Sequence, residues 1–171
     1  MQTQKKIAQT DAIFSYVHLV NEIADQTDGV IRLSIDTKAT VKVGDFSRGG
    51  YSRQGVKAAD HDFNPEIVLK PFGIFLPAYN ENYFYFTDSN VTADFMVDAL
   101  EDQHLKARFN PHTIVINSDN GPENNSPRSQ FMKRLIQFAL KHQVSISLAY
   151  HPPYHSKYNP TERVWAVLGN H

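Results

Sequence analysis

The sequence predicts an α/β fold in which one mixed β-sheet is flanked by helices. In the second half of the chain, strand-like apolar segments alternate with helix-like segments, an order typical of crossover connections and parallel pairing. In the first half, three strand-like segments follow one another with shorter connections, which favours an antiparallel meander. The expected sheet therefore has five strands, three antiparallel and then two parallel.

The first half of the chain begins with an expected helix over residues 6–26, where apolar residues recur at helical spacing. Alternating apolar and polar residues over 30–35 predict a half-buried strand, which Asp36 ends or interrupts. Residues 67–77 and 83–87 predict the second and third strands. A glycine-rich, charged loop separates the first two strands, over residues 44–61.

The second half begins with an expected helix for which Thr92 is a plausible N-cap. The expected elements are a helix over 92–109, a strand over 113–117, a helix over 129–142, a strand over 144–150 and a last helix from about Thr161. We expect residues 1–28 to form an N-terminal helical segment that packs on a core formed by residues 29–171.

Composition excludes several classes of protein. The chain has 171 residues, enough for one domain with a real core, and a formal net charge of −1. It has no cysteine, which rules out disulfides and a thiolate zinc site. No apolar run approaches the roughly 18 residues of a membrane span, and the start of the chain lacks the apolar stretch of a signal peptide. These features predict a cytosolic protein, and none of them points to DNA.

Three carboxylates occupy positions that suit a metal site. Asp36 and Asp119 each follow an apolar strand, and Glu162 lies in the first turn of the last helix. Strand ends in α/β sheets are common binding sites, and clustered carboxylates repel one another unless a cation lies among them. Oxygen ligands without cysteine suit Mg²⁺ or Mn²⁺, and two such ions about 4 Å apart can promote phosphodiester cleavage. Taken singly, an aspartate after a strand is more often a turn or cap residue than a metal ligand, and the helix dipole favours a glutamate in a first helical turn in any case.

Local sequence motifs strengthen this interpretation. Ser118-Asp-Asn-Gly-Pro-Glu-Asn124 resembles the second-aspartate motif of RNase H-like integrases and transposases. Tyr158-Asn-Pro-Thr-Glu-Arg-Val-Trp165 resembles the motif that carries the final glutamate in Tc/mariner-related enzymes, and Glu162 follows Asp119 by 43 residues. Segments 34–39, 44–50 and 149–160 resemble the ISAzo group of bacterial insertion-sequence transposases. The resemblance covers about residues 11–165.

The resemblance implies an RNase H-like fold with a catalytic, metal-binding triad of Asp36, Asp119 and Glu162. It implies two Mg²⁺ or Mn²⁺ ions, DNA strand cleavage with water, and strand transfer with a 3′-hydroxyl. The expected partners are transposon-end and target DNA, held by a homodimer or a larger assembly. A bacterial cytoplasmic location, associated with the nucleoid, follows as an expectation.

Several basic residues are candidates for contacts with DNA phosphates, although an exposed surface position explains most of them equally well. Glu123 could add a fourth acidic group, His151 is expected in the loop before Glu162, and Trp165 is expected to pack in the core. The DNA-binding candidates are Lys38, Arg48, Arg53, His155, Lys157 and Arg163.

The sequence departs from the group at both ends. Members usually carry a helix-turn-helix DNA-binding region before the core, and their pattern continues past a second glutamate after the tryptophan. We therefore expect a catalytic core without its N-terminal DNA-binding domain. Two alternatives stay open: an RNase H-like nuclease that does not join DNA, and an inactive transposase remnant that only binds DNA or a partner.

Overall fold

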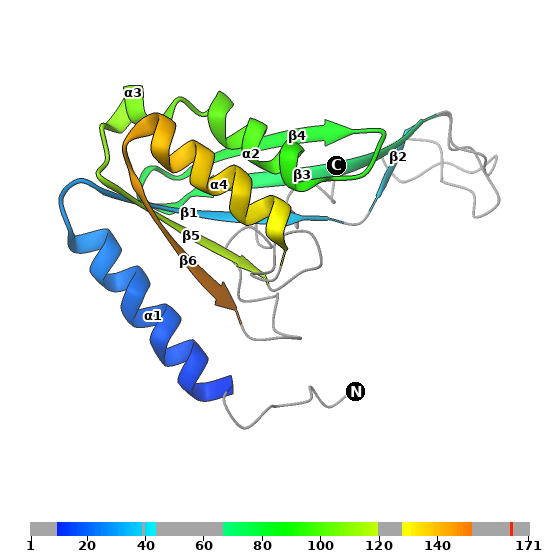
Figure 1. The fold of residues 1–171 in the computed structure, drawn as a ribbon. Coiled ribbons are helices and arrows are strands. Elements are labelled where there is room, and N and C mark those ends of the chain that lie inside the picture. The colour runs from blue at the N-terminus through cyan, green and yellow to red at the C-terminus, as the bar shows by residue number, and fades with distance from the viewer. Residues whose placement is uncertain (1–9, 39, 44–66, 120–127, 152–164, 166–171) are drawn as a thin grey trace.

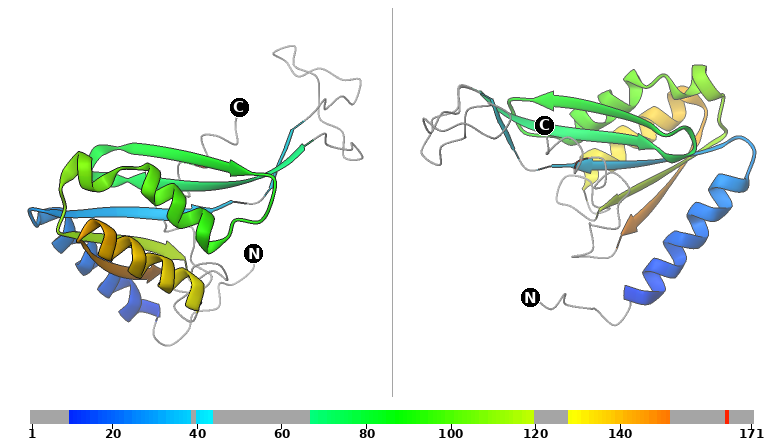
Figure 2. Two further views of the ribbon diagram at one scale, coloured as in Figure 1. Left: turned by 45° about the horizontal axis from the view of Figure 1, so that its top comes forward. Right: turned by 180° about the vertical axis from the view of Figure 1, so that it is seen from behind.

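The computed structural model describes residues 10–38, 40–43, 67–119, 128–151 and 165. A mixed β-sheet forms the central layer, with one long helix on one face and three helices on the other (Figures 1 and 2). The long helix is α1 (Thr10–Gln26), and the opposite face carries α2 (Ala93–Asp102), α3 (Leu105–Phe109) and α4 (Ser129–His142). No helix in these described ranges is long and apolar enough to cross a membrane.

The sheet has the predicted mixture of pairings. Its strands are β1 (Val30–Thr37), β2 (Val41–Val43), β3 (Ile67–Leu76), β4 (Glu81–Thr87), β5 (Thr113–Asp119) and β6 (Ser145–His151), with a 3₁₀ turn over Pro77–Tyr79. The pairs β1–β3 and β3–β4 are antiparallel, whereas β1–β5 and β5–β6 are parallel. The short strand β2 was not predicted, since three residues show no periodicity. It pairs with the beginning of β3.

Alternation along β1 divides its side chains between the two faces of the sheet. Leu33 and Ile35 are fully buried in the core beneath α2 and α4. Ser34 and Asp36 therefore point to the opposite face, which carries α1. The sequence predicted that Asp36 ends or interrupts the strand, but in the structure it does not. It pairs with Gly73 of β3, and β1 continues to Thr37 because this antiparallel pairing supports its last residues.

A polar network attaches α1 to the sheet. Arg32 of β1 donates two hydrogen bonds of 2.7 Å to the carboxylate of Asp25, and the amide of buried Asn117 donates to Asn21 at 2.9 Å. Val17 and Ala24 are the buried apolar residues of this helix. The helix therefore packs on β1 and β6 through both apolar and polar contacts. Residues 6–9 of the expected helix lie outside the described ranges.

The helix expected over residues 92–109 is divided in two. Thr92 is its N-cap, as predicted, and accepts a hydrogen bond from the backbone N–H of Phe95 at 3.2 Å. His104 adopts a left-handed conformation with φ of 49°, which separates α2 from α3. In one continuous helix, Leu100 and Leu105 would point about 140° apart. The break allows both leucines to be buried.

An ion-pair cluster joins α2 to α4. The carboxylate of Glu101 accepts hydrogen bonds from Lys141 Nζ at 3.0 Å and from His142 Nε2 at 2.8 Å. Burial by itself raises the pKa of Glu101, but the hydrogen bonds from Lys141 and His142 outweigh it and hold that pKa below its usual value. The ionised form of Glu101 therefore stabilises the packing of the two helices.

Glu101→Gln is expected to lower the free energy of unfolding by about 0.5–1 kcal/mol at neutral pH. A lowered carboxyl pKa contributes stability above the unfolded-state value, and this contribution disappears as the pH falls through the folded-state pKa. The difference between the two proteins should therefore shrink in acid, as measured by urea unfolding at neutral and acid pH. Glu22→Gln, at an exposed position of α1, is the control. An unchanged difference in acid would contradict the assignment to the Glu101 charge.

Candidate active site at the ends of three parallel strands

The parallel strands β1, β5 and β6 end at one edge of the sheet, and each carries a chemically distinctive residue there. Asp119, the last residue of β5, lies in register with His151, the last residue of β6. Ser34 of β1 lies in register with Asn117 of β5, and Asp36 and Asp119 each lie two residues further along their strands. Adjacent strands lie about 4.8 Å apart, so these residues form a row along the edge.

The row lies on the face of the sheet that carries α1. In β5, Ile114 and Ile116 belong to the core on the opposite face, so alternation directs Asn117 and Asp119 away from it. The same alternation in β1 directs Asp36 to this side. The local sequence thus produces the arrangement: apolar residues fix one face of each strand against α2 and α4, and the acids occupy the other.

Asp36 is buried, with 9% of its surface exposed, and its carboxylate is hydrogen-bonded. The indole Nε1–H of Trp165 donates to Asp36 Oδ2 at 3.0 Å. Burying a carboxylate is unfavourable unless hydrogen bonds compensate for lost water. The indole therefore both stabilises the buried carboxylate and fixes its orientation.

Trp165 is 2% exposed, which confirms the prediction that it packs in the core. Its ring packs against Phe84 of β4, with the ring centroids 4.9 Å apart. Lys38 donates from Nζ to the carbonyl oxygen of Trp165 at 3.1 Å, and Nζ lies 5.8 Å from the centroid of the Trp165 ring. Lys38, predicted to meet a DNA phosphate, thus connects the end of β1 to Trp165.

The hydrogen bond from Trp165 to Asp36 was not anticipated. The available signal was the position of Trp165, three residues after Glu162 in the same motif, which suggested that the tryptophan lies near the acidic residues. Sequence reasoning used that residue only for packing, because an indole N–H finds its partner through tertiary structure.

Trp165→Phe is expected to lower the free energy of unfolding by about 1–3 kcal/mol, since it removes a hydrogen bond to a buried charged group while keeping an aromatic ring. Urea unfolding measures this loss. The effect should become much smaller when the change is made in an Asp36→Asn background, because the two residues form one interaction. Equal effects in both backgrounds would assign the loss to packing instead.

His151 lies at the end of β6 and is 6% exposed. The sequence had placed it in a loop, but pairing with Asp119 extends the strand to include it. Neither of its ring nitrogens has a hydrogen-bond partner within the part of the chain that the structure describes. Burial lowers the pKa of His151, so the imidazole is neutral at neutral pH. It offers one donor and one acceptor beside Asp119.

The structure places two of the predicted triad residues, Asp36 and Asp119, at the same end of neighbouring parallel strands. Among the residues that it describes, no group of three or more His, Asp or Glu side chains is arranged to hold a metal ion. The other candidates lie outside the described ranges: Glu162, Glu123, Arg48, Arg53, His155, Lys157 and Arg163. Their proposed roles remain predictions.

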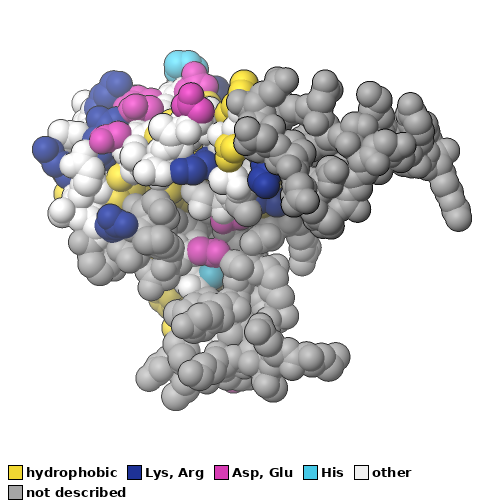
Figure 3. Space-filling model, turned by 90° about the vertical axis from the view of Figure 1, so that its right-hand side faces the viewer, with side chains coloured by type: hydrophobic (Ala, Val, Ile, Leu, Met, Phe, Trp, Pro, Cys, Tyr) yellow, Lys and Arg dark blue, Asp and Glu magenta, His cyan; other side chains and the backbone are white. Residues whose placement is uncertain are grey.

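Figure 3 looks onto the side of the molecule toward which the three parallel strands run. Acidic side chains and a histidine are visible near the centre of this side, and basic side chains lie above them. This distribution suits a site that combines carboxylates with a nearby anionic ligand.

The model of the Rhodopirellula transposase DDE domain matches residues 1–171. A search of curated proteins found no match.

Among solved structures, the Mos1 transposase paired-end complex with left transposon end has a TM-score of 0.63 and 12% identity, and the match covers 99% of this chain and 50% of that one. Mos1 mariner paired-end complexes with Mn and with Mg give TM-scores of 0.60 and 0.59 at 11% identity. They cover 99% of this chain and 51% and 50% of theirs. A simian T-cell lymphotropic virus intasome has a TM-score of 0.53 and 13% identity, and the match covers 82% of this chain and 38% of that chain. The fold is thus the RNase H-like fold of transposases and integrases, and the chain spans about half the length of the Mos1 chains.

Proposed function

This chain belongs to the family of Rhodopirellula transposase DDE domains, and from that premise we propose that it cuts DNA strands and joins the cut ends to other DNA in a metal-dependent reaction. The observation that carries the proposal is the placement of Asp36 and Asp119 on neighbouring parallel strands at one sheet edge. Such an edge is where α/β sheets usually bind ligands.

We propose that Asp36, Asp119 and Glu162 hold two Mg²⁺ or Mn²⁺ ions. The donor set fits these ions, because carboxylate oxygens on adjacent strands are the hard ligands that both prefer. Mos1 complexes with Mn and with Mg support the choice. When bound, the ions would activate the attacking oxygen and stabilise the leaving oxygen of a phosphodiester.

The residues around the carboxylates have supporting roles in this proposal. Trp165 orients Asp36 through its indole N–H. The neutral imidazole of His151 can donate a hydrogen bond to a group bound beside Asp119. Lys38 is exposed and lies two residues after Asp36, so its charge favours a phosphate near the site.

We further propose that the substrates are transposon-end and target DNA, held by a homodimer or a larger assembly. The Mos1 paired-end complex with left transposon end supports this part. Arg48, Arg53, His155, Lys157 and Arg163 are proposed as additional contacts to DNA phosphates. In this proposal residues 29–171 form the catalytic core, residues 1–28 pack on it, and the protein works in the bacterial cytoplasm beside the nucleoid.

The test is strand cleavage and joining by the chain with Mn²⁺, with Mg²⁺ and with chelator. We expect nicking of supercoiled plasmid with either metal and none with chelator. We also expect an oligonucleotide with a free 3′-hydroxyl to become joined to the plasmid. Nicking without joining would favour the nuclease alternative, and metal-independent or absent nicking would overturn the proposed activity.

A further inference from the structure

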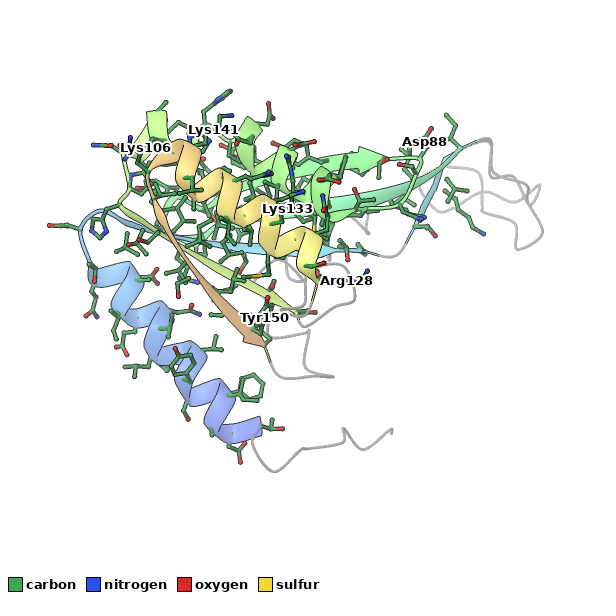
Figure 4. The ribbon with its side chains drawn as sticks, in the orientation of Figure 1. Asp88, Lys106, Arg128, Lys133, Lys141 and Tyr150 are labelled. Atoms are coloured by element: carbon green, nitrogen blue, oxygen red, sulfur yellow. The ribbon has the colours of Figure 1, made fainter. Side chains whose placement is uncertain are left out.

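A pocket of about 700 Å³ opens beside the end of β1, on the face of the sheet that carries α2 and α4. Thr37 and Lys38 line it from β1, and Lys70 lines it from β3. Segments that begin α2 and α4 complete the lining, including Arg128. Figure 4 shows Arg128 at the start of α4, near the edge where the parallel strands end.

The lining carries an excess of positive charge. Among the residues that the structure describes, Lys70 and Arg128 line the pocket together with one acidic residue, Asp94, whereas the ammonium of Lys38 donates to the carbonyl oxygen of Trp165. The Asp94 carboxylate is engaged elsewhere: its Oδ1 lies 3.1 Å from Arg134 Nε and accepts a hydrogen bond from Gln130 at 2.9 Å. Within the described part of the lining, Asp94 therefore does not balance the charge of Lys70, which favours an anionic occupant.

A hydrogen bond holds Lys70 in place. The residue is half-buried in β3, and its ammonium donates to the side-chain oxygen of Asn90, which also lines the pocket. Asn90 is neutral, so the hydrogen bond fixes the position of the ammonium but does not neutralise it. A cation that is fixed at a pocket wall by a neutral partner is suited to bind a phosphate.

The two helix ends add to this potential. Thr92 caps α2, whereas Arg128, at the N-cap of α4, makes no side-chain cap hydrogen bond. The backbone N–H groups in the first turns of both helices contribute partial positive charge close to Lys70 and Arg128. The effect is secondary to the basic side chains and has the same sign.

We propose that this Lys70–Arg128 pocket binds a backbone phosphate of the DNA duplex whose strand is cut at Asp36 and Asp119. This inference rests on the proposed function. Thr37 and Lys38, at its wall, directly follow Asp36, so the pocket and the carboxylates occupy the same sheet edge on opposite faces. A duplex presents one phosphate per about 3.4 Å of each strand. One lying across the edge therefore offers phosphates to both sites.

The experiment measures binding to a short fluorescein-labelled DNA duplex by fluorescence anisotropy over a range of salt concentrations, with chelator present so that no cleavage occurs. The variants are the wild type, Lys70→Gln with Arg128→Gln, and a control with Lys106→Gln and Lys133→Gln. Both double variants lose the same charge, but Lys106 and Lys133 do not line the pocket. Figure 4 shows Lys106 at the far end of the molecule from Arg128.

We expect the pocket variant to bind DNA at least several-fold more weakly than the wild type. The slope of log Kd against log salt concentration should fall by about 0.9 for each phosphate contact that is lost. The control should retain the wild-type slope. Equal weakening in both variants would assign the effect to net charge and overturn the proposed phosphate site. Unchanged binding by the pocket variant, or no DNA binding by the wild type, would also overturn it. Circular dichroism checks that each variant is folded.

Nicking of plasmid with Mn²⁺ separates the two proposals. Wild-type nicking combined with unchanged binding in the pocket variant would overturn the pocket while leaving the proposed function in place. Weaker binding in the pocket variant, with no nicking by the wild type, would support the pocket and overturn the catalytic proposal. Free inorganic phosphate, added as a competitor at constant ionic strength, should displace the duplex only weakly if the duplex is the occupant.

Discussion

Asp119→Asn is expected to reduce metal-dependent strand cleavage by at least about a thousandfold, which corresponds to roughly 4 kcal/mol of lost transition-state stabilisation. The substitution keeps the shape of the side chain and removes its negative charge. In the proposed site the carboxylate beside Asp36 is a direct ligand of the metal ions, and a neutral amide is a much weaker ligand for Mg²⁺ or Mn²⁺. Plasmid nicking with Mn²⁺ measures the loss.

Calorimetry supplies an independent readout of the same substitution. Binding of Mn²⁺ to the wild type should be lost or strongly weakened in Asp119→Asn. Asp88→Asn is the matched control, because Asp88 is an exposed residue directly after β4, and Figure 4 shows it far from Tyr150, the residue that precedes His151. Equal Mn²⁺ binding by the wild type and Asp119→Asn would contradict the assembled metal site and favour the remnant alternative.

Phe72→Ala is expected to lower the free energy of unfolding by about 3–5 kcal/mol. Phe72 is fully buried in β3 and pairs with Thr37 of β1. Its ring meets Phe95 of α2 edge to face, with centroids 6.2 Å apart. Truncation would leave a cavity between the sheet and α2, directly behind the strand that carries Asp36. Urea unfolding at neutral pH measures the change.

Phe86→Ala is the control for that measurement. Phe86 lies in neighbouring β4 but is 51% exposed, so its truncation removes little buried surface. We expect a loss below about 1 kcal/mol, in keeping with the usual effect of surface substitutions. Similar losses for the two variants would mean that Phe72 does not have the central packing role that the structure gives it.

The sequence by itself determined the elements whose signal is local. The apolar residues on one face of 129–142 predicted α4 with its observed bounds, and Thr92 marked the start of α2. Alternation over 30–35 correctly divided β1 into a core face and a polar face. Since each acid comes directly after an apolar segment, the sequence also placed Asp36 and Asp119 at strand ends, although the structure includes both residues in their strands. These features depend on spacing along a few residues, which the chain displays directly.

Only the tertiary structure decided the features that depend on distant partners. Trp165 donates to Asp36 across 129 positions in the chain, and no local pattern specifies that pairing. His151 belongs to β6 because Asp119 lies beside it in the neighbouring strand. The break at His104 arises because Leu100 and Leu105 must both reach one core. The Lys70–Arg128 pocket joins segments that are separate in sequence. Local spacing fixes which residues share a face, whereas packing and strand pairing fix which faces meet.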